Sequence, residues 1–421
     1  MNFKLVSFFY YLFLCSWILP SGSFLNIPIR ALLFLVLCLL VIIKVVAYRT
    51  EIKISIYSIY LVFIVCFANL WDVLSLINNQ IDCILTFNKE LISLVSSVII
   101  TDIFIKNRWT AVSIIFDMFK YTSIIFIFIK ILVELSLLFD VASYSQCMDN
   151  WEAIFSSYFV PGYLFIGNIQ LYRIETANDF IPLIVLMYDI IFCKCGIVGK
   201  IFSTILLPTY LIIVNTRIIF IQFLVILLCL FFEKILKKRV NKKQVFCFFV
   251  VIFILILNLE LCIHFYNSIV ERFSHASAAV ENSDFIRIEQ YQYLVSGISD
   301  RILLGHGLAS YIPFYLRDHV IMYKYELEYL SYIYQFGIIG FILLIGSLIY
   351  IFYRIIFNII KCRKLKLFIL LNFLFWGIRP LVNPHFLSSN SGMCIVCMYV
   401  LALYYCEKNI HREDKLNKNY Q

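Results

Sequence analysis

The sequence predicts an all-α integral membrane protein with about twelve transmembrane helices and two long loops on the outer face. Three observations predict it: the composition, the spacing of the apolar segments and the distribution of Lys and Arg. Of the 421 residues, 62% are hydrophobic and 14% are charged, whereas soluble domains average about 45–50% apolar and about 25% charged residues. We therefore expect a single polytopic membrane domain over residues 1–421.

The apolar segments set the expected spans. A bilayer core about 30 Å thick needs roughly 17–25 apolar residues per helix. The first segment begins like a signal peptide, but no small-residue cleavage site is evident and a second segment follows at once, so we interpret it as a span. The expected spans lie near residues 5–20, 27–48, 54–71, 84–105, 112–140, 180–195, 197–215, 218–233, 245–263, 327–353, 367–382 and 392–406.

Lys and Arg residues lie mostly in alternate connections between these segments, with the strongest run at 233–243 and another at 354–366. An excess of Lys and Arg marks the cytoplasmic side of a membrane protein. With about twelve spans, all of these connections fall on one side, so we expect both termini in the cytoplasm. The same pattern accounts for the net charge of +9, and we expect no nucleic-acid partner.

Two connections on the opposite side are long, at 140–179 and 264–326. Long loops in a compact fold are usually functional or disordered. Both contain too many aromatic and aliphatic residues to be disordered. We expect them to fold against the membrane surface, partly as amphipathic helices.

Five arginines are expected at the outer face, where positive charge is disfavoured. Charges close to hydrocarbon are costly and tend to be functional, and Arg binds phosphate through two hydrogen bonds. The alternative for each is a side chain that snorkels and pairs with a nearby carboxylate. The five are Arg217, Arg272, Arg287, Arg317 and Arg379.

Two further segments contain candidate groups. In RILLGHGLASY, His306 lies between Gly305 and Gly307, which permit a tight turn; a hydrogen-bonded loop histidine is the alternative to a functional one. In YELEYLSYIYQFGIIGF, Glu326 is expected in the first turn of a helix and on the same face as Gly337. Glu326 is a candidate general base, and capping of the helix N-terminus is the alternative.

Residues 210–410 resemble the Wzy-type polysaccharide polymerases and the related O-antigen ligases. The resemblance rests on an ordered set of features rather than on one motif. NTRIIF places an Arg at an outer helix junction, and VERF and FIRIEQ supply spaced arginines in a long outer loop. The loop ends in LLGHG, the helix ELEYLSYIYQFGIIG follows, and NPHFLSSNSG leads into the final span.

The resemblance implies a glycosyltransferase with a GT-C-like fold in the bacterial inner membrane. Such an enzyme moves a growing glycan from undecaprenyl diphosphate to the non-reducing end of a lipid-linked repeat unit, at the outer face. Because the donor is already activated, neither a cofactor nor a metal is expected. The implied partners are the lipid-linked oligosaccharide, membrane lipid, a chain-length regulator and a flippase.

The resemblance also suggests roles for the candidate residues. Arg217 and Arg287 are expected to stabilise the diphosphate leaving group, and Glu326 is expected to activate the acceptor hydroxyl. The expected substrate-binding residues are Arg272, Arg379, His306 and Arg317.

The sequence departs from the ligase pattern at one position. Ligases carry His-Asn at the start of the helix, and Glu326 occupies the His position here, which favours a polymerase. A ligase, a flippase or other transporter, and a purely structural membrane subunit remain as alternatives. A transporter would account for the charged residues inside the predicted spans, which are Asp117, Lys120, Lys130, Glu134 and Asp189.

Overall fold

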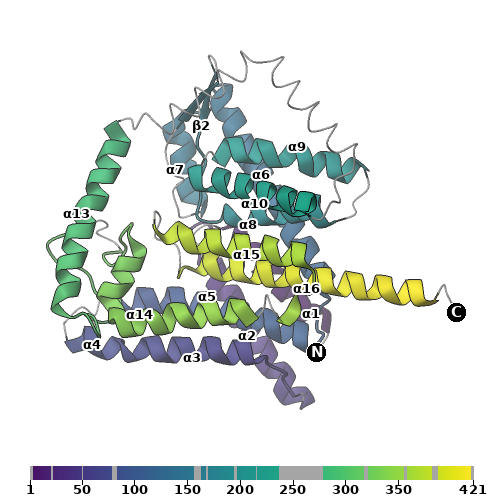
Figure 1. Cartoon of the computed structure of the whole chain (residues 1–421), viewed down its shortest axis with the longest axis horizontal. Coiled ribbons are helices and arrows are strands. Elements are labelled where there is room, and N and C mark those ends of the chain that lie inside the picture. Colours follow the sequence, from purple (N-terminus) through teal and green to yellow (C-terminus); the bar gives the residue numbers. More distant parts are fainter. Residues whose placement is uncertain are drawn as a thin grey trace.

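The computed structural model describes residues 3–19, 22–49, 51–77, 83–155, 163–166, 169–193, 197–214, 216–236, 278–316, 321–354, 358–381 and 387–418. In these ranges the chain is helical, apart from one two-stranded hairpin and the connections (Figure 1). Most of the buried apolar side chains among the described residues form one large cluster that extends from Val6 to Ala402. The protein is a multi-pass membrane protein, because several of its helices are long and apolar enough to cross a bilayer.

Five helical segments of the described residues meet this requirement by length and composition: Ile29–Ala47, Ser58–Ile77, Ile84–Lys106, Val112–Leu138 and Glu328–Arg354. The helices that contain them are α2 (Ile29–Tyr48), α3 (Ile56–Leu70) with α4 (Asp72–Ile77), α5 (Ile84–Lys106), α6 (Val112–Leu138) and α14 (Glu328–Arg354).

Four shorter apolar helices match other predicted spans. They are α1 (Phe3–Cys15), α8 (Phe180–Phe192), α9 (Ile197–Val214) and α10 (Arg217–Leu236). In α8, every residue from Phe180 to Asp189 is buried, and a helix that is apolar all round belongs in a protein core. The predicted spans at 367–382 and 392–406 correspond to α15 (Arg363–Ile378) and α16 (Ser389–Lys418). The span predicted at 245–263 lies outside the described residues, so the total number of spans stays a prediction.

Successive connections along the chain lie at opposite ends of the helices, and connections at the same end contact one another. At one end, Asn107 after α5 accepts a hydrogen bond from the backbone N–H of Lys53 before α3, at 3.0 Å. At the other end, Arg30 at the start of α2 donates to Asn390 at the start of α16, at 2.9 Å. This alternation agrees with the pattern of Lys and Arg along the sequence.

The two long loops that were predicted at the outer face contain regular structure. In the first are α7 (Tyr144–Phe155) and the antiparallel hairpin of β1 (Tyr163–Ile166) and β2 (Ile169–Tyr172). In the second is α13 (Ala278–Asp300), which runs across the direction of α3 and α14 near one end of these helices (Figure 1). Helices were expected in these loops and are present, their packing against the membrane surface stays a prediction, and the hairpin was not predicted.

The first part of α14 differs from the prediction in two ways. It starts at Glu328, so Glu326 lies two residues before the helix and not in its first turn. The helix also breaks at Gly337, which has φ 65° and ψ 180°. The expectation of one continuous helical face from Glu326 to Gly337 is therefore wrong.

The break in α14 has a physical cause, because the LLGHG segment packs against it. The backbone N–H groups of His306 and Gly307 donate to Tyr334 O and Gln335 O, each at 2.9 Å. Beyond the break, the N–H of Ile338 donates to Ile302 O at 2.9 Å. A broken helix at membrane depth is tolerated where other protein groups satisfy its backbone, and the 301–308 loop does this for α14.

Gly337 fits this contact only because it has no side chain. A Cβ at this position would overlap Leu303 O and would lie 2.6 Å from Gly305 N. Its positive φ is also one that L-residues rarely adopt. The two glycine-containing motifs seen in the sequence thus form a single joint between the 301–308 loop and α14.

Candidate functional site

The candidate site is an ion pair next to the N-terminus of α14. Arg287, on α13, donates through Nε to Oε2 of Glu326 at 2.7 Å. The Glu326 side chain is only 10% exposed, while that of Arg287 is 32% exposed. The pair therefore joins a nearly buried carboxylate to a cation that reaches the surface. Two residues that the sequence singled out separately thus lie in direct contact.

One face of α13 holds this arrangement in place. Arg287, Gln290, Leu294 and Gly297 follow at i, i+3, i+7 and i+10, so they share a face. Gln290 is completely buried and its Oε1 accepts the backbone N–H of Glu326 at 2.8 Å. Because Gln290 fixes the backbone that carries the carboxylate, it positions Glu326 toward Arg287.

A small apolar cluster supports the same face, formed by Leu294, Ile312, Tyr325 and Tyr334. The Tyr325 hydroxyl accepts the backbone N–H of Ile312 at 2.9 Å and donates to Tyr315 O at 3.3 Å. Burial raises the pKa of Tyr325 well above its ordinary value, so the phenol stays neutral and keeps both hydrogen bonds. The residue just before Glu326 is thereby anchored.

His306 lies next to this cluster, in the loop that joins α13 to α14. Its ring stacks on Tyr334 with 4.3 Å between centroids, and its Nε2 donates to Gly297 O at 2.8 Å. These contacts fit the alternative in which His306 is a hydrogen-bonded loop residue. We therefore interpret it as part of the loop–helix joint.

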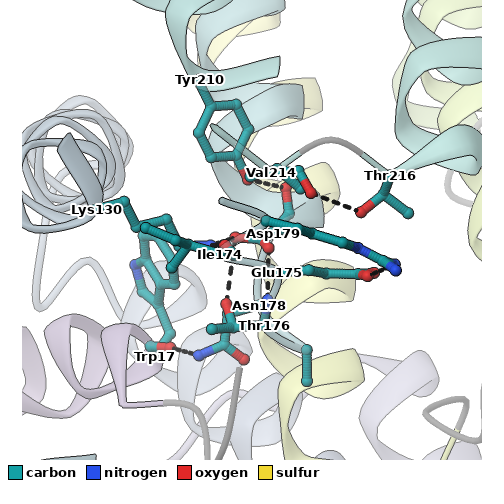
Figure 2. A network of polar contacts seen from close by, with 12 residues as sticks. Trp17, Lys130, Ile174, Glu175, Thr176, Asn178, Asp179, Tyr210, Val214 and Thr216 are labelled. Carbon is teal, nitrogen blue, oxygen red and sulfur yellow. Dashed lines mark hydrogen bonds and ion pairs between the residues drawn. The ribbon is translucent and has the colours of Figure 1, made fainter. Parts of the chain in front are cut away.

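A second polar cluster lies in the core beside β2, α8 and α9 (Figure 2). Lys130 of α6 is 0% exposed and donates to Asp179 Oδ1 at 2.5 Å and to Ile174 O at 2.6 Å. Asp179 also accepts the backbone N–H of Thr176 at 2.7 Å, and the Tyr210 hydroxyl donates to the Asp179 carbonyl at 2.6 Å. The charge of Lys130, which lies inside the fifth predicted span, is thus balanced by Asp179.

Three other charged residues inside the predicted spans, Lys120, Asp189 and Glu134, also have polar partners. Lys120 lies 2.8 Å from Asp189 Oδ1, and Ser203 donates to Asp189 Oδ2 at 2.8 Å. Glu134 accepts the backbone N–H of Tyr172 at 2.8 Å. A transport pathway was one explanation for these charges, but their contacts fit a structural role.

Replacing Lys130 by Met tests this structural role. The change leaves Asp179 buried without its cation, and removing one partner of a buried pair costs about 3–5 kcal/mol. We expect a large drop in the thermal unfolding temperature of the detergent-purified protein. Lys324→Met, which breaks the more exposed pair with Glu90, is the matched control and should change stability by about 1 kcal/mol or less. Equal losses in the two variants would contradict this role.

Arg379 lies beside the buried cluster, in the short 3-10 helix η3 (Arg379–Leu381) that follows α15. It is buried, with Nη1 donating to Ala177 O at 3.2 Å and Nη2 lying 3.8 Å from Glu175 Oε1. Arg173 also donates to Glu175. Arg379 is therefore not part of the Arg287–Glu326 pair, although Tyr329 of α14 donates to the nearby Gly377 carbonyl.

The remaining candidates cannot be placed in the site. Arg217 is the first residue of α10, and its side chain lies outside what the structure describes. Arg272 and Arg317 lie entirely outside the described residues. Sequence reasoning also missed Gln290. Its spacing of three residues from Arg287 in a helix was the available signal.

The comparisons with known proteins match one part of the chain to a family. Residues 202–345 match the family described as O-antigen ligase. This part of the chain is a domain of the O-antigen ligase and polymerase family. Arg287, His306, Glu326 and the break at Gly337 all fall inside the domain, whereas Arg379 lies beyond it. Members of the family are membrane glycosyltransferases that act on lipid-linked glycans. No curated protein matches the chain.

Proposed function

We propose that the protein is a polysaccharide polymerase. It transfers a growing glycan from undecaprenyl diphosphate to the non-reducing end of a lipid-linked repeat unit, at the outer face of the bacterial inner membrane. The observation that carries the proposal is the Arg287–Glu326 pair, held at the outer end of α14 inside an O-antigen ligase family domain.

The proposed chemistry uses the two members of the pair differently. An acceptor hydroxyl attacks the anomeric carbon of the donor glycan and gives its proton to the Glu326 carboxylate. The bond between that carbon and the diphosphate oxygen breaks, and the diphosphate leaves with the electron pair. Arg287 stabilises the negative charge that develops on the leaving group, and Arg217 and Arg272 are proposed to assist. The step balances without a cofactor, a metal or a nucleotide sugar.

The exposure of the pair suits this division of roles. Because Glu326 is nearly buried, its interaction with a hydroxyl proton is stronger than it would be in water. The more exposed Arg287 reaches the surface, where the diphosphate of a membrane-anchored donor would lie. Gln290 keeps the carboxylate in place before substrate binds, so that less reorganisation is needed in the transition state.

An O-antigen ligase is the second candidate, because the matched family is described by that activity. The two reactions share the donor and differ in the acceptor. Glu326 stands where ligases carry His, so this position favours the polymerase. The ion pairs Lys120–Asp189 and Lys130–Asp179 give these charges a structural role, which favours the polymerase over a transporter.

The wider setting is part of the same proposal. The chain would form one polytopic domain of about twelve spans, with both termini in the cytoplasm and the loops at 140–179 and 264–326 outside. Its partners would be the lipid-linked oligosaccharide, membrane lipid, a chain-length regulator and a flippase.

Gel analysis of surface glycan in a deletion strain tests the proposal. Loss of a polymerase leaves a single repeat unit attached at the surface, and this is the result that we expect. Long polymer that remains on the lipid carrier would identify a ligase. Repeat units that accumulate in the cytoplasm would identify a flippase, and either result would overturn the proposal.

A further inference from the structure

The exposed side of α13 carries a stripe of apolar residues. Ile288, Tyr291 and Val295 follow at i, i+3 and i+7, so their side chains share one face of the helix. They are 56%, 54% and 39% exposed. The face of α13 that packs on the protein is a different one, on which Gln290 and Leu294 are completely buried. Packing within the protein therefore accounts for only one of the two faces.

The turn that follows α13 extends this apolar surface. Ile302, Leu303 and Leu304 are 46%, 63% and 51% exposed. We call these residues, together with the three on the helix, the α13 stripe. Large exposed apolar patches are uncommon on surfaces that face only water, and they mark contact with a membrane or with a partner.

One end of the α13 stripe adjoins a helix that is suited to cross the membrane. The backbone N–H of Ile338 donates to Ile302 O at 2.9 Å, and the N–H of Ile339 donates to Leu303 O at 3.3 Å. Ile338 and Ile339 belong to α14, which is long and apolar enough to span a bilayer, and both are exposed. Because the exposed apolar side chains of a spanning helix meet lipid, the α13 stripe continues a surface that contacts the bilayer.

The direction of α13 fits a helix that lies in the membrane surface. It runs across the direction of α3 and α14 (Figure 1), and both of these contain segments able to cross a membrane. A helix in this orientation buries its apolar face about 5–10 Å into the boundary between headgroups and acyl chains. Tyr291 suits this boundary, where aromatic residues with a polar end are enriched. The neighbouring face is polar and exposed at Gln292, Ser296 and Ser299, as the side toward water should be.

We propose that α13 lies in the outer interface of the membrane, with the α13 stripe inserted among the acyl chains of the bilayer phospholipids. The inference rests on the proposed function, which puts this loop at the outer face. Arg287 directly precedes Ile288 and is partly exposed, so it lies at the level of the headgroup phosphates. The diphosphate of the donor is held at that level by its own lipid chain. It therefore reaches Arg287 without leaving the membrane.

An environment-sensitive label tests this contact in the full-length protein. A genetically encoded dansyl amino acid replaces one residue at a time, because the 14 cysteines of the chain make thiol labelling unselective. Ile288 and Val295 are the stripe positions, and Gln292 and Ser296 are the matched positions on the polar face. Each purified variant is placed in nanodiscs of phosphatidylethanolamine and phosphatidylglycerol, with or without phospholipid brominated on its acyl chains. Thermal unfolding confirms that each variant is folded, and the second position of each pair serves if the first does not fold.

Brominated lipid quenches only a label that touches acyl chains. We expect it to remove about half of the dansyl emission at Ile288 and Val295, because an interfacial helix inserts its apolar face about 5–10 Å deep. We expect unchanged emission at Gln292 and Ser296. The emission maximum should also be shifted to shorter wavelength at the stripe positions alone.

Three results would overturn the proposal. Emission that is unquenched at all four positions and typical of water would place α13 above the membrane. Equal quenching at all four would show that no face of α13 is selected by lipid. A blue-shifted but unquenched label on the α13 stripe would mean that protein, such as a second copy of the chain, covers it. Because the measurement involves no turnover, a quenched stripe in a protein that never extends a glycan would contradict the proposed function alone.

Discussion

Cells whose only copy of this protein carries Arg287→Ala are expected to make no long polymer. Arg287 pairs with the nearly buried carboxylate of Glu326 and is itself partly exposed at the surface. In the proposed mechanism it stabilises the leaving diphosphate. Removing one such charge-stabilising donor typically lowers kcat by about 10²–10³. The measurement is chain length by gel electrophoresis of surface glycan, together with the amount of the variant protein in the membrane.

The control for this variant is Arg301→Ala. Arg301 is an exposed arginine in the turn just after α13, so its removal takes the same charge from the same outer region. We expect wild-type chain length from it. Arg217→Ala should behave like Arg287→Ala if both arginines face the diphosphate. Wild-type polymer from both Arg217→Ala and Arg287→Ala would refute the roles assigned to these arginines.

Gly337→Ala is expected to destabilise the protein strongly. The positive φ of Gly337 and the overlap of a Cβ with Leu303 O mean that the 301–308 loop must separate from α14. A strained backbone costs about 1–3 kcal/mol, and lost hydrogen bonds of the joint add to it. We expect a lower thermal unfolding temperature in detergent and loss of polymer, because the joint holds the segment that leads to Glu326.

Gly346→Ala is the matched control in the same helix. Gly346 is helical, and no atom lies within 4 Å of a Cβ built there. Alanine should be neutral or stabilise the helix by about 0.5–1 kcal/mol. A loss of stability that is equal at the two positions would show that any alanine in α14 is harmful. It would also show that the loss of stability in Gly337→Ala is not caused by the break in the helix.

Composition and periodicity predicted much of the fold. Apolar segments and alternating positive charge indicate where a chain crosses the bilayer, because transfer of side chains into lipid depends mainly on local sequence. The boundaries of α5 and α6 therefore match the predicted spans closely. The hairpin of β1 and β2 has no such local signal, since its strands are four residues each.

The candidate site was predicted as separate residues rather than as an arrangement. The unusual positions of Arg287 and Glu326 were visible in the sequence, but the two are 39 positions apart and only tertiary packing brings them together. Gly305 was assigned to a tight turn and Gly337 to the face of a helix, and no contact between the two was predicted. Their contact forces the break in α14, and a local pattern cannot predict such a contact.

The most direct test of the central claim is transfer by the purified protein in liposomes. The only glycan supplied would be the undecaprenyl-diphosphate-linked repeat unit, and products would be separated by chain length. The proposed mechanism predicts lipid-linked chains of increasing length, with one undecaprenyl diphosphate released for each bond formed, and no such products from Glu326→Gln. If the wild-type protein forms no longer chains, or transfers glycan only when a different acceptor lipid is added, the polymerase assignment is contradicted.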